Sequence, residues 1–318
     1  MFILSTLLPE PNLIQEIQKM YPSDQFSFYK SMDEAKKDLD KAEVLITYGE
    51  DLTPGLIEQA KRLKWIMVMS AGLELMPFKA IMQKGVLVTN ARGIHKIPMA
   101  EYTISMMLHI AKRNKQLLTQ QQDRNWNRLG IIPVDELHGK TVGILGVGAI
   151  GGEIARLAKA FNMKVIGLNR SGKDHEYVDQ MYKYEELNTI CSTADYLVSV
   201  LPSTNETKYL LNESHFNVMK NELVFINIGR GDLVKEEVLL HALNTNKISH
   251  AILDVFEQEP LPKDHPFWAH EKITVTPHIS SKTDNYLPRS FEIFNRNFTI
   301  LKQGGTEFIN KIDPERGY

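Results

Sequence analysis

The amino-acid sequence predicts an α/β protein built on parallel β-sheets. Short apolar segments alternate along the chain with polar segments of helical length, an order typical of parallel strands joined by right-handed crossover helices. Several apolar segments, such as VLITYG (44–49) and LVFINIG (223–229), are nearly continuous rather than alternating. Continuous apolar strands are typical of sheets that helices cover on both faces.

The apolar segments fall into two series, which predicts two domains. The longest helical pattern, 99–122, lies between the series, and the segment TDNYLPR (283–289) precedes a last helix that we expect to return to the first domain. We therefore place one domain at 1–95 with 286–318 and the other at 96–285. The expected strands are 1–7, 25–29, 44–49, 65–70 and 86–90 in the first series, and 141–146, 164–169, 196–201, 223–229, 250–256 and 273–278 in the second.

Composition narrows the class of protein. The 318 residues carry a formal net charge of −2, so no basic field indicates a nucleic-acid partner. The single cysteine, Cys191, excludes an internal disulfide framework and suits a reducing compartment. The chain start lacks the basic region and cleavage site of a signal peptide, and no apolar run is long enough to span a bilayer. We expect a soluble cytoplasmic protein with no membrane partner.

The stretch GILGVGAIGGEIARLAKAF (143–161) carries the most informative motif. Gly146, Gly148 and Gly151 form the pattern G-x-G-x-x-G after an expected strand and at the start of an expected helix. In dinucleotide-binding folds the first glycine allows a tight turn, the second lets the backbone approach the pyrophosphate, and the third allows close helix–strand packing. The helix N-terminus then offers N–H groups to phosphates. The alternative is an α/β turn that binds nothing.

The end of the next strand, 164–169, bears on the choice of cofactor. An acid at this position usually accepts hydrogen bonds from the adenosine ribose, and it would repel a 2′-phosphate. This chain has Asn169, Arg170 and Ser171 there instead. A guanidinium pairs well with a phosphate, and a hydroxyl can donate to one. The sequence therefore predicts a preference for NADP(H) over NAD(H); the alternative is a solvated loop arginine.

Polar side chains mark the ends of three neighbouring strands in the second series. They are Arg230, Asp254, Glu259 and His278. Because the carboxyl ends of parallel strands share one edge of a sheet, where ligands bind, we expect these side chains to converge beside the glycine turn. Taken singly, each has a structural alternative: a capping histidine, an arginine in a surface turn or a solvated glutamate.

Five separated motifs resemble the D-isomer specific 2-hydroxyacid dehydrogenase family, and within it the glyoxylate/hydroxypyruvate reductases. The motifs are GVGAIG, VLPST, NIGRGDLV, LDVFEQEP and TPHISS, in that order. Two further segments, VMSAGLELMP and VTNARGIHKIPMAEY, extend the resemblance over nearly the whole chain. The resemblance implies two flavodoxin- or Rossmann-like doubly wound domains with the active site in a cleft between them.

The resemblance also implies roles for individual residues. Arg230, Glu259 and His278 would be catalytic. The substrate carboxylate would be held by Ser70, Ala71 and Gly72. The cofactor would be bound by the three glycines and Asn169, Arg170 and Ser171, together with Ala149, Ile150, Leu201, Pro202, Thr207, Ile228, Gly229, Ser280 and, at the nicotinamide end, Asp254. Relatives commonly pair through the nucleotide domain, which implies a homodimer.

The chemistry of 2-oxo acid reduction suits these residue types. A nicotinamide supplies a hydride to the carbonyl carbon, and His278 would supply a proton to the carbonyl oxygen, since imidazoles titrate near neutral pH. Glu259 would orient the imidazole, and Arg230 would hold the carboxylate or the polarised carbonyl. We therefore expect an NAD(P)H-dependent reductase that forms the D-2-hydroxy acid.

Alternatives remain open at this point. An NAD-linked biosynthetic dehydrogenase of the same family would use the same residues. A dinucleotide-sensing co-regulator of the same fold would bind the cofactor without turnover. No metal is expected, because the remaining histidines are scattered and no H-E-x-x-H pattern is present.

Overall fold

The computed structural model describes residues 1–70, 72–73, 75–128 and 134–313, and the chain forms two compact units. Unit 1 comprises Met1–Ile94 and Thr283–Tyr318, and unit 2 comprises His95–Lys282. The boundaries expected near residues 95 and 286 lie close to these divisions. Both ends of the chain therefore contribute to unit 1, and the second strand series lies in unit 2.

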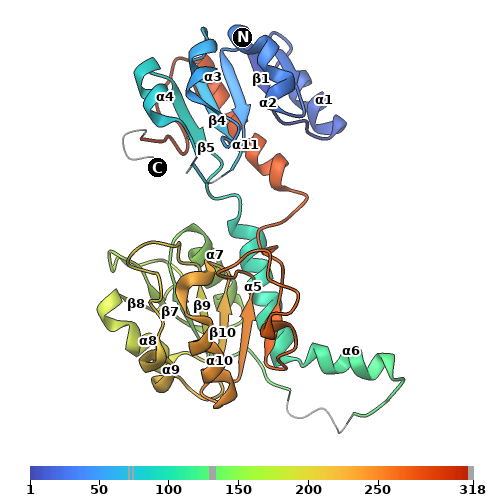
Figure 1. Cartoon of the computed structure of the whole chain (residues 1–318), viewed down its shortest axis with the longest axis vertical. Coiled ribbons are helices and arrows are strands. Elements are labelled where there is room, and N and C mark those ends of the chain that lie inside the picture. The colour runs from blue at the N-terminus through green and yellow to red at the C-terminus, as the bar shows by residue number, and fades with distance from the viewer. Residues whose placement is uncertain (71, 74, 129–133, 314–318) are drawn as a thin grey trace. The chain divides into compact units, whose positions relative to one another are not determined.

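A five-stranded parallel sheet forms the centre of unit 1, with the strand order β2-β1-β3-β4-β5 (Figure 1). This is the flavodoxin-like order. Its strands are β1 (Phe2–Ser5), β2 (Gln25–Phe28), β3 (Val44–Thr47), β4 (Trp65–Val68) and β5 (Leu87–Asn90). Its helices are α1 (Pro11–Met20), α2 (Met32–Ala35), η1 (Lys36–Lys41), α3 (Pro54–Gln59), α4 (Phe78–Lys84) and α11 (Tyr286–Lys302).

Helices cover both faces of this sheet, because its central strands are apolar on both sides. α1 and α11 pack on one face, where Phe294 of α11 stacks on Trp65 of β4 with ring centroids 5.2 Å apart. α2, α3 and α4 cover the other face, where Ile57 lies in one apolar cluster with Leu45 and Ile66. α11 is therefore a layer of unit 1 although it comes from the far end of the chain.

A seven-stranded parallel sheet forms the centre of unit 2, in the order β12-β11-β10-β9-β6-β7-β8. Its strands are β6 (Thr141–Leu145), β7 (Lys164–Leu168), β8 (Gln180–Tyr182), β9 (Tyr196–Ser199), β10 (Val224–Asn227), β11 (His250–Leu253) and β12 (Ile273–Val275). Its helices are α5 (Lys96–Ala111), α6 (Asn114–Gln122), α7 (Ala149–Ala160), η2 (Tyr184–Glu186), α8 (Leu187–Thr193), α9 (Glu213–Val218), η3 (Gly231–Leu233), α10 (Glu236–Asn244) and η4 (Pro266–Trp268).

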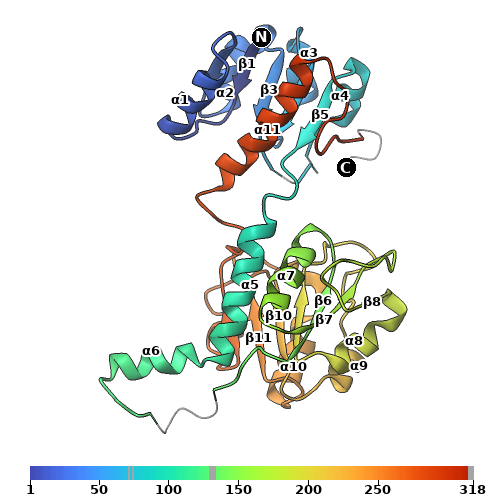
Figure 2. The same ribbon diagram turned by 180° about the vertical axis from the view of Figure 1, so that it is seen from behind.

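The strand order of unit 2 is that of a dinucleotide-binding Rossmann sheet with one strand added at an edge. The chain runs from β6 outward through β7 and β8, and then returns to the other side of β6 with β9. Ligands bind at such switch points, beyond the carboxyl ends of the strands. α5 and α7 cover one face of the sheet, and α8, α9 and α10 cover the other (Figure 2).

The structure contains every strand that the sequence predicts, and it adds one. β8 (Gln180–Tyr182) is a short edge strand without an apolar run, so periodicity gave no signal for it. The single helix expected at 99–122 is wrong: α5 ends at Ala111 and α6 begins at Asn114, because Arg113 adopts a left-handed conformation with a φ of 55°.

The second part of that expected helix, α6, buries no apolar face. None of its residues is buried, so no core contact keeps it in line with α5. Figures 1 and 2 both show α6 extending away from the rest of unit 2. In the described part of the chain, no helix combines the length and the apolar character needed to cross a membrane.

Candidate active site

The glycine turn between β6 and α7 has the geometry that its motif predicts. Gly146 has a φ of 104°, a conformation that favours glycine. A Cβ atom on Gly151 would lie 2.3 Å from the Gly146 carbonyl oxygen, so only glycine lets α7 pack this closely on the turn. A Cβ atom on Gly148 would meet no atom within 4 Å. The turn therefore leaves room for a phosphate group at the N-terminus of α7.

A cavity of about 350 Å³ lies at the switch point of the sheet, and its size is typical of small-ligand sites. The loops that follow β6, β7 and β9 line it. The lining residues that the sequence predicts as cofactor ligands are Gly146, Gly148, Asn169, Arg170, Leu201, Pro202 and Thr207. Five further lining residues are not among the predicted cofactor ligands: Val147, Tyr184, Val200, Thr204 and Glu206.

Six other predicted cofactor ligands lie in or next to the strand ends of this sheet edge but do not line the cavity. Ala149, Ile150 and Gly151 begin α7. Ile228 and Gly229 are buried directly after β10. The Ser171 hydroxyl lies 3.2 Å from Asn169 Oδ1, to which it donates, and the Asn169 amide donates to the Lys173 carbonyl at 3.0 Å. Ser171 therefore stabilises the turn that presents Arg170.

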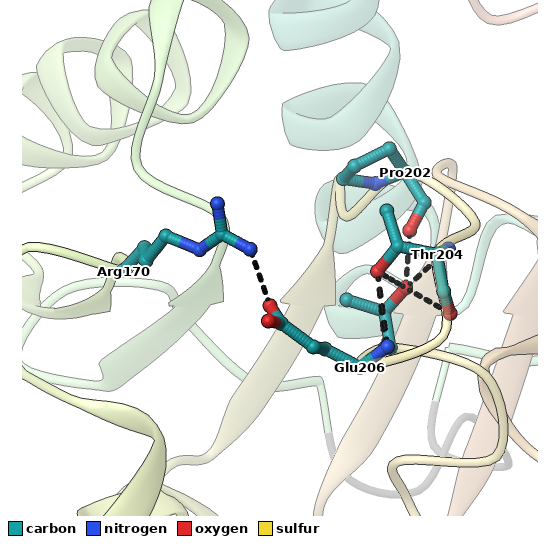
Figure 3. Close-up of polar contacts among 5 residues, drawn as sticks. Arg170, Pro202, Thr204 and Glu206 are labelled. Carbon is teal, nitrogen blue, oxygen red and sulfur yellow. Dashed lines mark hydrogen bonds and ion pairs between the residues drawn. The ribbon is translucent and has the colours of Figure 1, made fainter.

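Arg170 is paired with an acid that the sequence analysis did not single out. Its Nη2 atom donates to Glu206 Oε2 at 2.6 Å (Figure 3). The Arg170 side chain is 78% exposed and the Glu206 side chain is 61% exposed. Glu206 belongs to the loop after β9, which neighbours β6 in the sheet. A cation and an acid therefore face the same cavity from two different strand ends.

The strand ends that carry the predicted catalytic residues are brought to one edge of the sheet. β10, β11 and β12 are neighbours, and their register places Asn227, Leu253 and Val275 side by side. Arg230 and His278 follow shortly after these positions. This edge also carries the glycine turn, because all seven strands are parallel.

His278 and Glu259 are in direct contact. His278 Nδ1 lies 2.7 Å from Glu259 Oε2, and Glu259 Oε1 accepts from the Phe256 N–H at 3.0 Å. Because a carboxylate accepts, the imidazole donates through Nδ1, which leaves Nε2 for proton exchange with a ligand. The His278 side chain is 45% exposed, so the imidazole is accessible.

The loop of His278 is held by Asp254, which is completely buried. Asp254 Oδ1 accepts from Thr276 Oγ1 at 2.6 Å and from the Ile279 N–H at 2.9 Å, and Oδ2 accepts from the Ser280 N–H at 2.9 Å. His278, between these donors, has a φ of 51°. Left-handed backbone is uncommon for residues other than glycine, and the hydrogen bonds that Asp254 accepts on both sides of His278 stabilise this conformation.

A partly buried tyrosine extends this network. The Tyr102 hydroxyl of α5 lies 2.7 Å from Thr276 Oγ1. Since the Thr276 hydroxyl donates its one hydrogen to Asp254, Tyr102 must be the donor. Burial raises the pKa of Tyr102 to about 12, so the phenol keeps its proton. Tyr102 and Thr276 both lie in segments of the family resemblance, but their contact was not predicted, because it joins the long helix to the last strand.

Arg230 follows β10 at the same edge of the sheet. Its Nη1 atom donates to the Gly229 carbonyl at 2.7 Å, and its own carbonyl accepts from Asn227 Nδ2 at 2.9 Å. Across the described residues, no hydrogen bond links its guanidinium to Glu259 or His278. The side chain is exposed and keeps donors for an anionic ligand.

The predicted carboxylate loop lies in unit 1, after β4. The Ser70 hydroxyl is 3.0 Å from the Gly72 carbonyl and 3.3 Å from the Tyr48 carbonyl; Ala71 lies outside the described residues. The ring centroids of Tyr48 and Tyr286 are 6.4 Å apart, and burial raises the pKa of Tyr286 to about 12. Burial also raises the pKa of Tyr48, whose carbonyl contacts this loop, so both phenols are neutral.

Comparison with known proteins identifies the family of this chain. The profile of the D-isomer specific 2-hydroxyacid dehydrogenase NAD binding domain matches residues 104–280. A glyoxylate reductase of Thermofilum pendens is 30% identical over 95% of this chain and 91% of its own. A glyoxylate reductase of Aeropyrum pernix is 34% identical over 78% of this chain and 76% of its own.

A solved structure is similar over almost its whole length. It is a D-isomer specific 2-hydroxyacid dehydrogenase family protein from Aeromonas salmonicida, 33% identical, with a TM-score of 0.82 and 98% of both chains covered. Fold and site together define an oxidoreductase with a nicotinamide dinucleotide cofactor. The chain belongs to the D-isomer specific 2-hydroxyacid dehydrogenase family.

Proposed function

We propose that the protein reduces a small 2-oxo acid to the D-2-hydroxy acid with NADPH or NADH. The observation that carries the proposal is the His278–Glu259 contact of 2.7 Å at the sheet edge that also carries the glycine turn. Candidate substrates are glyoxylate, hydroxypyruvate and short branched oxo acids. The relatives named glyoxylate reductase support this class of substrate.

Each residue of the candidate site would have a separate role in the reaction. The bound nicotinamide supplies the hydride. His278 gives a proton from Nε2 to the carbonyl oxygen, while Glu259 holds the opposite ring nitrogen. Arg230 binds the substrate carboxylate and stabilises charge that develops on the carbonyl. The loop of Ser70, Ala71 and Gly72 supplies further donors to the carboxylate.

NADP(H) is the preferred cofactor in this proposal, and NAD(H) is accepted. The support is Arg170 at the cavity, where a guanidinium can pair with a ribose 2′-phosphate. The absence of an acid at the end of β7 removes the usual repulsion of that phosphate. The cavity would hold the adenosine end, with the glycine turn at the pyrophosphate.

The test is a panel of 2-oxo acids assayed with both reduced cofactors. Oxidation of NADPH with glyoxylate, hydroxypyruvate or a branched oxo acid, giving the D-product on chiral chromatography, is the expected result. Turnover with NADH alone would favour the NAD-linked biosynthetic dehydrogenase. Tight cofactor binding without turnover of any acid would favour the dinucleotide-sensing co-regulator.

We also propose that the protein is a cytoplasmic homodimer. The support is α6 with its following segment, in which Leu118 is 57% exposed and Trp126 is 96% exposed. Such exposed apolar groups, one on a projecting helix and one just after it, suit a second copy of the chain. Light scattering of the purified protein should give twice the chain mass. A monomer at micromolar concentration would contradict the proposed homodimer.

A further inference from the structure

We propose that Glu206 is a specificity-determining residue for the cofactor, because it neutralises the cation that a ribose 2′-phosphate needs. This inference rests on the proposed function, since it concerns the adenosine end of the same dinucleotide site. Arg170 Nη2 donates to Glu206 Oε2 at 2.6 Å, and both residues line the cavity at the switch point (Figure 3). A phosphate therefore has to replace a carboxylate that already holds Arg170.

The two charges come from different places in the fold. In NAD-binding Rossmann sheets the acid at the ribose follows the second strand, and here that position carries Asn169 and Arg170. An acid is nevertheless present, because Glu206 reaches the cavity from the loop after β9. The site thus combines the cation typical of NADP(H) sites with the negative charge typical of NAD(H) sites.

The position of Glu206 is fixed by its loop. Thr207 Oγ1 donates to the Pro202 carbonyl at 2.6 Å, and the Glu206 N–H donates to Thr204 Oγ1 at 3.3 Å. Thr207 is only 4% exposed, so the turn is anchored in the interior. The backbone of Glu206 is therefore held beside Arg170, and only its side chain has to move when a ligand arrives.

The expected effect is moderate, because the pair is exposed. Exposed ion pairs change an equilibrium constant by roughly one- to fivefold. A 2′-phosphate paired with Arg170 would also be repelled by the Glu206 carboxylate, which lines the same cavity. Both contributions oppose the phosphorylated ribose, and neither acts on an adenosine that lacks the phosphate.

The experiment measures binding by calorimetry on the full chain with two fragments, 2′,5′-ADP and 5′-AMP. Glu206→Gln should raise the affinity for 2′,5′-ADP about fivefold and change that for 5′-AMP by less than about twofold. The control is Glu222→Gln, an exposed residue just before β10, at the opposite edge of the sheet. It removes the same charge and should alter neither affinity.

The same substitution made in the Arg170→Ala variant separates the effect of the Arg170–Glu206 ion pair from repulsion between Glu206 and the phosphate. In Arg170→Ala the gain from Glu206→Gln should fall below about twofold, because no cation is left to release. An unchanged or weaker affinity of Glu206→Gln for 2′,5′-ADP, or an equal gain in Arg170→Ala, would overturn the inference. Because the readout is binding, absence of 2-oxo acid turnover would refute the proposed function and leave this result standing.

Discussion

Two parts of the candidate site in unit 2 are built in opposite ways. At the edge of β11 and β12, a completely buried Asp254 accepts three hydrogen bonds from the loop of His278. At the ends of β7 and β9, Arg170 and Glu206 form one ion pair that is mostly exposed. Buried hydrogen-bonded charges are costly to disturb, whereas exposed pairs contribute little. The proposed proton donor is therefore held firmly, while cofactor choice can change through single surface substitutions.

The largest expected effect comes from removing the imidazole itself. His278→Ala should lower kcat for the best 2-oxo acid by about 10²- to 10⁴-fold, since it removes the proton donor, while NADPH binding stays within about twofold. His265 is a matched control, because its Nε2 also pairs with a carboxylate, Glu236, at 3.0 Å. Near-full turnover by His278→Ala, or an equal loss in His265→Ala, would remove His278 from the reaction.

Asp254→Asn tests whether the buried carboxylate positions His278. An amide has one acceptor oxygen, and its NH₂ group would face an N–H or O–H donor of the loop. We expect a loss of about 1–3 kcal/mol in the free energy of unfolding in urea, with a decrease of roughly tenfold in kcat. The exposed Asp264 offers the control Asp264→Asn. If Asp254→Asn matches that control in both measurements, the buried network is not what holds the loop.

The comparison also separates what the sequence could predict from what it could not. Neighbouring parallel strands end at the same edge of the sheet, so the polar residues after β10, β11 and β12 had to emerge together. This arrangement brings His278 and Glu259 close enough to make contact. The glycine turn was equally predictable, because each glycine has a mechanical role. These features depend on the order of strands and helices, which the hydrophobic periodicity of the sequence predicts well.

Side-chain direction is harder to predict, and the missed residues all depend on it. The Tyr102–Thr276 contact joins α5 to β12, and the Arg170–Glu206 pair joins two loops. No local pattern encodes either contact. The break at Arg113 was missed for a related reason: α6 is polar and helix-forming in sequence, but no apolar face keeps it in line with α5.

Arg170→Asp tests the exposed Arg170–Glu206 part of the candidate site. It removes the guanidinium and adds a second acid beside Glu206, so kcat/KM with NADPH should fall about tenfold or more, with little change for NADH. Lys164→Asp is the control, because Lys164 is an exposed cation at the opposite end of the same strand, β7. An equal decrease with both cofactors would show that Arg170 does not recognise the 2′-phosphate.

The smallest effect is expected for Tyr102→Phe, which removes one hydroxyl from the hydrogen-bond network of Asp254. Because burial raises the pKa of Tyr102 to about 12, the phenol donates to Thr276 over the whole working range of pH. Its loss leaves a Thr276 lone pair without a donor and should cost about 0.5–1.5 kcal/mol in the free energy of unfolding. We expect kcat to decrease by roughly two- to fivefold, since Asp254 still holds the loop. Tyr29→Phe, which removes a hydroxyl bound to Asp38 in unit 1, should leave kcat unchanged; a decrease of the same size in that variant would show that the Tyr102 effect is not specific to the His278 loop.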